Sequence, residues 1–115
     1  MTVKMNIDDQ QFEVKLYDNP AAKAFVNTLP LQLGMEELNG NEIFADLPHK
    51  LPLNPVRPGT IHAGDLMLYG TQTLVLFYAS FESSYRYTLI GKVIHPEHLP
   101  TRVDKKKIRV RFYDH

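Results

Sequence analysis

Strict alternation of apolar and polar residues near both ends of the chain is the strongest constraint on its fold. Residues 3–7 and 12–16 carry apolar side chains at every second position, and the polar stretch 8–10 separates them. Residues 108–112 repeat the same period of two. Because side chains alternate between the two faces of a β-strand, this pattern predicts a hairpin and a further strand, each with one face in the core.

The second half of the chain predicts strands that are buried on both faces. Residues 66–69 and 74–78 are almost continuously apolar, and a turn at 70–72 separates them. Such runs are typical of central strands that are covered on both sides. Another strand is expected over 87–94, where Gly91 indicates a barrel corner or a bulge.

Two short helical segments are expected between the strands. Asn19 is a typical N-cap, and a proline follows it at the first helical position. Apolar residues then recur at helical spacing from Ala22 to Leu29, where a further proline ends the helix. A single helical turn is expected at 96–99.

A third alternating strand at 31–36 leads into the stretch 37–63, which is predicted to be long and irregular. This stretch contains four prolines and the Asn39-Gly40 pair, a strong signal for a tight turn. A short edge strand is expected at 43–45. Prolines on both sides of Val56-Arg57 hold that pair extended and make the loop stiff.

Together these elements predict a mainly β protein in which residues 1–115 form a single domain. A chain of 115 residues has room for one compact domain and argues against two. Repeated antiparallel hairpins with two lone helices favour a closed or nearly closed barrel with helices at its ends.

The residue types that are missing exclude several kinds of chemistry. The chain has no cysteine, which excludes disulfides, a cysteine nucleophile and thiolate metal sites. No apolar run approaches the ~20 residues of a membrane span, and the alternating N-terminus is unlike a signal peptide. We therefore expect a cytoplasmic protein with no membrane partner.

Charge is divided unevenly along a chain whose net charge is zero. Residues 1–50 carry 4 basic and 8 acidic residues, and residues 51–115 carry 9 basic and 5 acidic ones. The basic residues near the C-terminus are Arg102, Lys105, Lys106, Lys107, Arg109 and Arg111. Such a cluster can bind phosphate, but here it alternates with apolar residues like the solvated face of a strand. No aromatic residue is interleaved with it, and no nucleic-acid partner is expected.

A metal centre is not expected either. His95, Glu97 and His98 lie close enough in sequence to reach one metal ion from a helical turn. Pro96 favours a helix start instead, and no distant third ligand is evident. The chain also lacks a glycine-rich phosphate loop, so neither a nucleotide nor another cofactor is expected.

One set of residues has the composition of a hydrolytic triad. It combines His62 and Asp65 with a serine from the segment 80–84. The chain has no Gly-x-Ser-x-Gly elbow, which argues against a serine hydrolase. Asp65 is expected to cap a turn or to accept backbone hydrogen bonds before its strand.

Aromatic residues are concentrated between positions 69 and 87 and indicate a possible ligand pocket. Leu76, Phe77 and Tyr87 are expected to be mostly core, whereas residues near strand ends suit a pocket wall. Phe81 is either a lid over such a pocket or an ordinary loop anchor. The arginine of the stiff loop either binds a carboxylate or carbonyl of a ligand or ties down backbone carbonyls. The predicted ligand-binding residues are Arg57, Tyr78, Phe81, Tyr85 and Arg86.

Segments over most of the chain resemble a known family in their order and spacing. The segments are 18–25, 29–31, 38–42, 46–48, 54–61, 63–70, 74–78 and 85–91. Over residues 10–113 they are similar to the small bacterial cyclophilin-like domain proteins. The resemblance implies an eight-stranded cyclophilin-like antiparallel β-barrel with two short helices.

The resemblance also implies two kinds of activity. Isomerising cyclophilins rotate an X-Pro bond in an apolar pocket, where an arginine donates a hydrogen bond to the proline nitrogen. Arg57 and Gly64-Asp65 match parts of their catalytic stretch, but the Phe-Met-x-Gln part is absent and the chain has no tryptophan for the pocket wall. Similar domains in 5-oxoprolinase and urea-amidolyase systems help to bind or process a small amide or carboxylate.

We therefore expect a domain that binds a small carboxylate, amide or peptide on the barrel face without cyclophilin-type isomerase activity. One alternative is a peptidyl-prolyl isomerase. Another is an interaction module that dimerises through an edge strand or the apolar loop 43–53. Both a monomer and a homodimer are compatible with these hypotheses.

Overall fold

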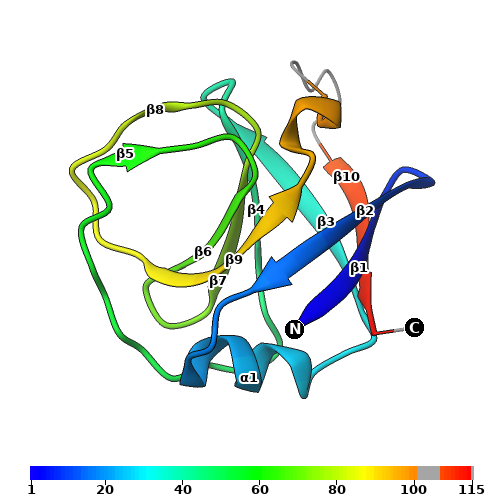
Figure 1. Ribbon diagram of the computed structural model, residues 1–115, viewed down its shortest axis with the longest axis horizontal. Coiled ribbons are helices and arrows are strands. Elements are labelled where there is room, and N and C mark those ends of the chain that lie inside the picture. The colour runs from blue at the N-terminus through cyan, green and yellow to red at the C-terminus, as the bar shows by residue number, and fades with distance from the viewer. Residues whose placement is uncertain (101–106, 115) are drawn as a thin grey trace.

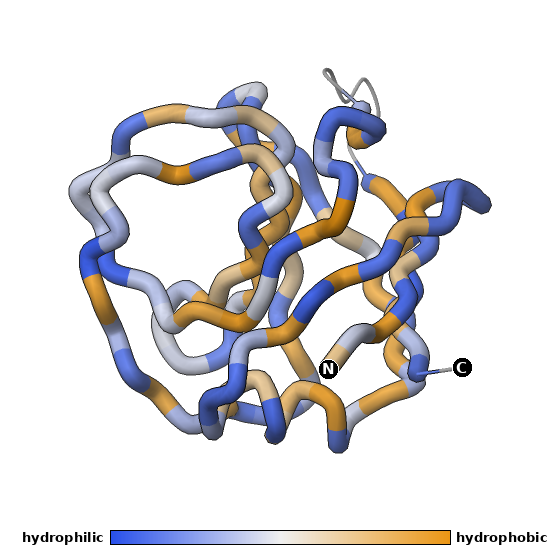
Figure 2. The backbone as a smooth tube through the Cα atoms, viewed as in Figure 1, coloured by the Kyte–Doolittle hydropathy of each residue, from blue (hydrophilic) through white to orange (hydrophobic). Residues whose placement is uncertain are grey.

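Alternating burial confirms the predicted hairpin and the strand that joins it. In the computed structural model, which describes residues 1–100 and 107–114, every second residue of strands β1 and β2 is buried. These strands pair across Asp8 and Asp9, whose positive φ angles are those that a tight hairpin turn requires. Strand β10 alternates in the same way and pairs with β1, which brings the two ends of the chain together (Figures 1 and 2).

The elements follow the predicted order, except that two short strands, β5 and β8, were not predicted. They are β1 (Thr2–Ile7), β2 (Gln10–Leu16), α1 (Pro20–Val26), β3 (Leu31–Leu38), β4 (Glu42–Asp46), β5 (Thr60–Ile61), β6 (Asp65–Tyr69), β7 (Thr73–Phe77), β8 (Phe81–Glu82), β9 (Thr88–Ile94), the 3-10 turn η1 (Pro96–His98) and β10 (Lys107–Tyr113).

Eight of these strands close into an antiparallel barrel, as predicted. Their order around the wall is β1-β10-β3-β4-β7-β6-β9-β2, while β5 and β8 form a separate two-stranded sheet. Helix α1 lies at one end of the barrel and η1 near the other (Figure 1). The fully buried ring of Phe25 in α1 meets that of Phe112 edge-on at 5.2 Å, so the helix plugs its end of the core.

Asn19 explains where α1 begins and how it is attached. Its side-chain oxygen accepts a hydrogen bond from the Ala22 amide at 2.8 Å, and its side-chain nitrogen donates to the Leu89 carbonyl at 3.0 Å. The helix ends at Val26, three residues before the predicted Leu29. The last amides, including that of Leu29, bond to carbonyls only three residues back, which tightens the final turn into a 3-10 form.

A strand forms at the predicted residues 43–45, but it is not an edge strand. Strand β4 pairs with β3 on one side and with β7 on the other, so it lies inside the barrel wall. Asn39 and Gly40 form the predicted tight turn, both with positive φ, and β3 continues to Leu38. The irregular part of the predicted loop is therefore shorter and begins only after Asp46.

The predicted irregularity at Gly91 is confirmed. Leu66 of β6 pairs with Gly91, whereas the next residue, Met67, pairs with Leu89, so Ile90 is the extra residue of a bulge. A Cβ atom at position 91 would lie 2.6 Å from the Lys15 carbonyl oxygen of β2. The barrel wall therefore requires glycine at the point where β2 and β9 approach most closely.

The basic cluster is only partly described. Lys107, Arg109 and Arg111 are exposed on the outer face of β10, where they alternate with buried residues as predicted. The other three cluster residues, Arg102, Lys105 and Lys106, lie outside the described residues. Within 1–100 and 107–114, no helix is long and apolar enough to cross a membrane.

Candidate functional site

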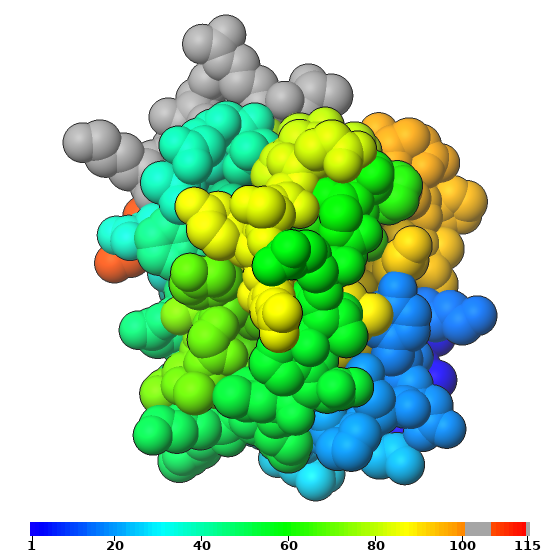
Figure 3. All heavy atoms as spheres, turned by 90° about the vertical axis from the view of Figure 1, so that its left-hand side faces the viewer, coloured from blue at the N-terminus to red at the C-terminus, as the bar shows by residue number. Residues whose placement is uncertain are grey.

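A second, smaller core lies on the outside of the barrel wall. Strands β6 and β7 are apolar on both faces, so the barrel interior takes residues such as Leu66 and Leu76, and the outer face keeps others. Those outer residues, Met67, Val75 and Phe77, are buried together with Ile61 and Tyr87. The segments 51–64 and 79–87 supply the cover and lie side by side on this face (Figures 1 and 3).

An isolated β-bridge positions the two arginines that the sequence analysis selected. Val56 and Tyr87 exchange two backbone hydrogen bonds of 2.9 Å each. Arg57 follows one bridged residue and Arg86 precedes the other, and both side chains are exposed. Within the described part of the chain, neither guanidinium forms an ion pair.

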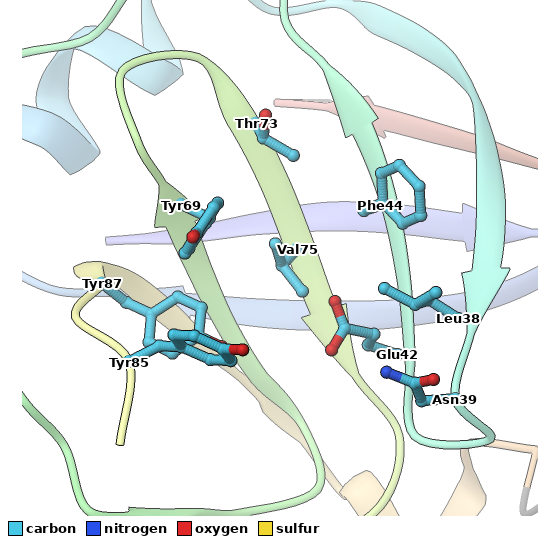
Figure 4. A pocket seen from close by; sticks show the side chains of 9 residues that line it. All are labelled: Leu38, Asn39, Glu42, Phe44, Tyr69, Thr73, Val75, Tyr85 and Tyr87. Carbon is cyan, nitrogen blue, oxygen red and sulfur yellow. The ribbon is translucent and has the colours of Figure 1, made fainter. Parts of the chain in front are cut away.

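The first pocket at the margin of this outer core has a volume of about 320 Å³. It lies between strand β4 and the segment that carries Tyr85 and Tyr87 (Figure 4). We call it the Glu42 pocket. Its lining residues are Leu38, Asn39, Glu42, Phe44, Tyr69, Thr73, Val75, Tyr85 and Tyr87.

A second pocket of about 340 Å³ adjoins the first, and we call it the Arg86 pocket. Tyr69, Tyr85 and Tyr87 line both pockets, so their rings form the partition between them. Tyr69 meets the Tyr85 ring at 6.0 Å and the Tyr87 ring at 5.7 Å, at interplanar angles of 80° and 56°. We call the two adjoining pockets together the groove. The remaining residues of the Arg86 pocket are Leu53, Pro55, Leu68, Gly70, Thr71, Arg86 and Thr88.

The Glu42 pocket disfavours negative charge on the residues that line it. Burial raises the pKa of Glu42, and the neighbouring Glu37 carboxylate raises it further. Burial also raises the pKa of Tyr87, to which the negative charge of Glu42 adds, although a hydrogen bond with Ser83 acts in the opposite direction. Both shifts show that additional negative charge is unfavourable in this pocket.

The structure brings together some of the predicted site residues and separates others. Tyr85 and Arg86 line the groove, whereas Arg57 is exposed and is not among the residues that line either pocket. Tyr78 is buried and donates a 2.8 Å hydrogen bond to Glu37, and it is not among the groove-lining residues. Phe81 packs on Phe77 in the outer core, with 5.6 Å between the ring centres. This is the packing of a loop anchor.

Sequence reasoning missed several residues that line the groove. Leu38, Glu42 and Phe44 belong to the β3–β4 hairpin, whose pairing with β7 brings them opposite Tyr69. One signal for them was present in the sequence. Leu38 is an apolar residue on the outward face of β3, where the alternating pattern otherwise places polar residues and Gly34. The prediction that Leu76, Phe77 and Tyr87 are core residues is confirmed, although Tyr87 also reaches the groove.

The triad composition does not produce a catalytic arrangement. His62 Nδ1 lies 4.0 Å from Asp65 Oδ2, beyond hydrogen-bond distance, while the same carboxylate accepts the His62 amide at 2.9 Å. The predicted backbone role of Asp65 is therefore confirmed. The Ser80 hydroxyl accepts a hydrogen bond from the Ala63 amide at 3.0 Å.

The histidines near η1 do not assemble a metal site. Their rings stack at 5.7 Å, and His95 Nδ1 lies 3.1 Å from a Glu97 carboxylate oxygen. Over residues 1–100 and 107–114, no group of three or more histidine, aspartate or glutamate side chains is placed to hold a metal ion.

Comparison with known proteins agrees with this architecture. No curated protein matches the chain. The model of one protein family, described as the Cyclophilin-like family, matches residues 5–113. This match covers almost the whole barrel, from β1 to β10, and includes every residue of the groove. The chain therefore belongs to the Cyclophilin-like family.

Proposed function

We propose that the protein binds a peptide or a small ligand with amide and carboxylate groups in the groove on the outer face of the barrel. The observation that carries this proposal is where apolar surface remains exposed. Of the seven large apolar side chains exposed in the described residues, four line the groove. They are Leu38, Leu53, Tyr69 and Tyr85. Concentrated apolar surface of this kind typically marks a binding site.

The polar groups of the groove favour a ligand with separated functional groups. Tyr85 and its neighbours offer aromatic faces and hydroxyls in the middle. Arg86, which forms no ion pair with any described residue, offers a guanidinium group at one end, which suits a carboxylate or a peptide carbonyl. A short peptide that ends in a carboxylate fits this order of groups.

Binding without isomerisation is the form of the proposal that the sequence favours. The chain lacks the Phe-Met-x-Gln part of the cyclophilin catalytic stretch and has no tryptophan. Arg57 is retained, but it lines neither pocket. Arg86, which does line the groove, suits an anionic group better than a neutral proline nitrogen.

The test is a titration with acetyl-Phe-Ala, followed by backbone amide signals in ¹H–¹⁵N NMR spectra. Signals from the groove, including Tyr69, Tyr85 and Arg86, are expected to shift at millimolar peptide. Tyr85→Ala is expected to weaken binding by about fivefold or more, as truncation of a pocket aromatic usually does. Tyr17→Ala is the matched control because Tyr17 is exposed but lies outside both pockets.

Two results would contradict the proposal. Absence of shifts in the groove at saturating peptide, or shifts confined to another face, would show that the groove is not a binding site for such ligands. Faster cis–trans exchange of a proline peptide at high protein concentration, measured by NMR exchange spectroscopy, would instead show isomerase activity.

A further inference from the structure

Glu42 is a half-buried carboxylate without a counter-ion. Within residues 1–100 and 107–114 its side chain forms no hydrogen bond or ion pair. Its neighbour Glu37 differs, because the Glu37 carboxylate accepts hydrogen bonds from the Gly40 amide and from the Tyr78 hydroxyl. Glu37 is thus held by the β3–β4 turn, and Glu42 is left facing the pocket (Figure 4).

The other walls of the Glu42 pocket also favour positive charge. Tyr69 meets the Tyr85 ring at 80° and the Tyr87 ring at 56°, so neither pair stacks face to face. The face of an aromatic ring carries partial negative charge and attracts a cation within about 6 Å of its centre. Among the described residues that line this pocket, Glu42 is the only charged one.

Other classes of occupant fit the Glu42 pocket less well. An anion would be repelled by Glu42 and by Glu37 behind it. Burial is the main cause of the raised pKa of Glu42, and the Glu37 charge adds to it. A neutral apolar group would remove water from the carboxylate without replacing its interactions, which costs free energy. A cation with an apolar covering satisfies both the carboxylate and the tyrosine rings.

We propose that the Glu42 pocket binds an organic ammonium group, such as an alkylated amine, through the Glu42 carboxylate and the faces of the three shared tyrosines. This inference rests on the proposed function only for the groove being a binding site. It adds that the groove has a direction. The cationic part of a ligand lies at Glu42, and the anionic part lies at Arg86 in the adjoining pocket.

The experiment compares two small probes of the same shape. Choline carries a quaternary nitrogen, and 3,3-dimethyl-1-butanol has a carbon atom at the same position and no charge. Titration of each probe into the intact protein at fixed ionic strength is followed by the amide signals of Leu38, Glu42 and Tyr85. Choline is expected to bind at least about tenfold more tightly, because the Glu42 carboxylate and the tyrosine rings both favour its charge.

Substitutions then assign this preference to Glu42. Glu42→Gln keeps the shape of the side chain and removes its charge, and we expect it to reduce the preference for choline to about twofold or less, the neutral rings alone remaining. Glu36→Gln is the matched control because Glu36 is an exposed residue of β3 that does not line the pocket. It is expected to leave the preference unchanged.

The possible failures can be told apart. Equal binding of the two probes, or a preference that survives in Glu42→Gln, would overturn the ammonium inference while the groove remains a peptide site. Failure of choline to shift any groove signal, in a protein that binds acetyl-Phe-Ala, would overturn it as well. Failure of acetyl-Phe-Ala to bind would contradict the proposed function, and the choline comparison would still decide the inference.

Discussion

Replacement of Gly91 by alanine tests whether the close contact between β2 and β9 is essential to the barrel. The added Cβ would lie 2.6 Å from the Lys15 carbonyl oxygen and 3.2 Å from the Leu16 Cα, both backbone atoms. Strand β2 cannot move away alone, because it also pairs with β1 over six residue pairs. The clash must therefore be relieved by displacing the barrel wall.

The magnitude follows from these contacts. Overpacking in a well-packed site costs about 1–3 kcal/mol, and a backbone obstacle places this case at the upper end of that range. The lower chain entropy of alanine in the unfolded state returns about 0.4–1 kcal/mol. We expect Gly91→Ala to lower the free energy of unfolding by about 2–3 kcal/mol, or Tm by about 8–12 °C for a chain of this size.

Urea denaturation followed by circular dichroism measures this loss. Gly34→Ala is the matched control, because its Cβ would meet only the side chain of Lys107, at 3.0 Å from Cε. That exposed side chain can move, so Gly34→Ala is expected to change stability by less than about 0.5 kcal/mol. If the two variants have the same stability, the reasoning from backbone contact at Gly91 is wrong.

Two further predictions concern the helix cap and the pocket carboxylate. Asn19→Ala is expected to cost about 1–2 kcal/mol in urea denaturation because it removes the cap to Ala22 and the bond to Leu89; a loss no larger than that of Asn19→Asp, which keeps the cap but not the amide donor to Leu89, would show that the cap contributes nothing. Because the pKa of Glu42 is raised in the folded protein, ionisation of its carboxyl destabilises the fold as pH rises above 4.5. Glu42→Gln is therefore expected to be more stable than the wild type at pH 7, by up to about 1 kcal/mol. Thermal unfolding should show this advantage shrink below pH 4.5, where Glu42 is protonated in both states, and no advantage at pH 7 would contradict the burial argument.

Local physical rules determined much of this protein from its sequence. Alternation over 3–7 and 12–16 specifies a half-buried hairpin, because a strand presents successive side chains to opposite faces. Asn19 specifies the start of α1 because its side chain accepts a hydrogen bond from the backbone amide three residues later. Gly91 in a strand indicates a barrel corner or a bulge, and the structure has a bulge there. Each of these signals involves residues near one another in the chain.

Only the tertiary structure decided where the groove lies and which charge it carries. Glu42 in sequence is an ordinary polar residue of a short strand, and its setting depends on β4 being paired on both sides. That pairing brings Leu38 and Glu42 opposite Tyr69 and Tyr85, which are 27 to 47 positions away in the chain. The periodicity of a strand reports which face is buried but not which strand lies beside it. The partners are set by closure of the whole barrel.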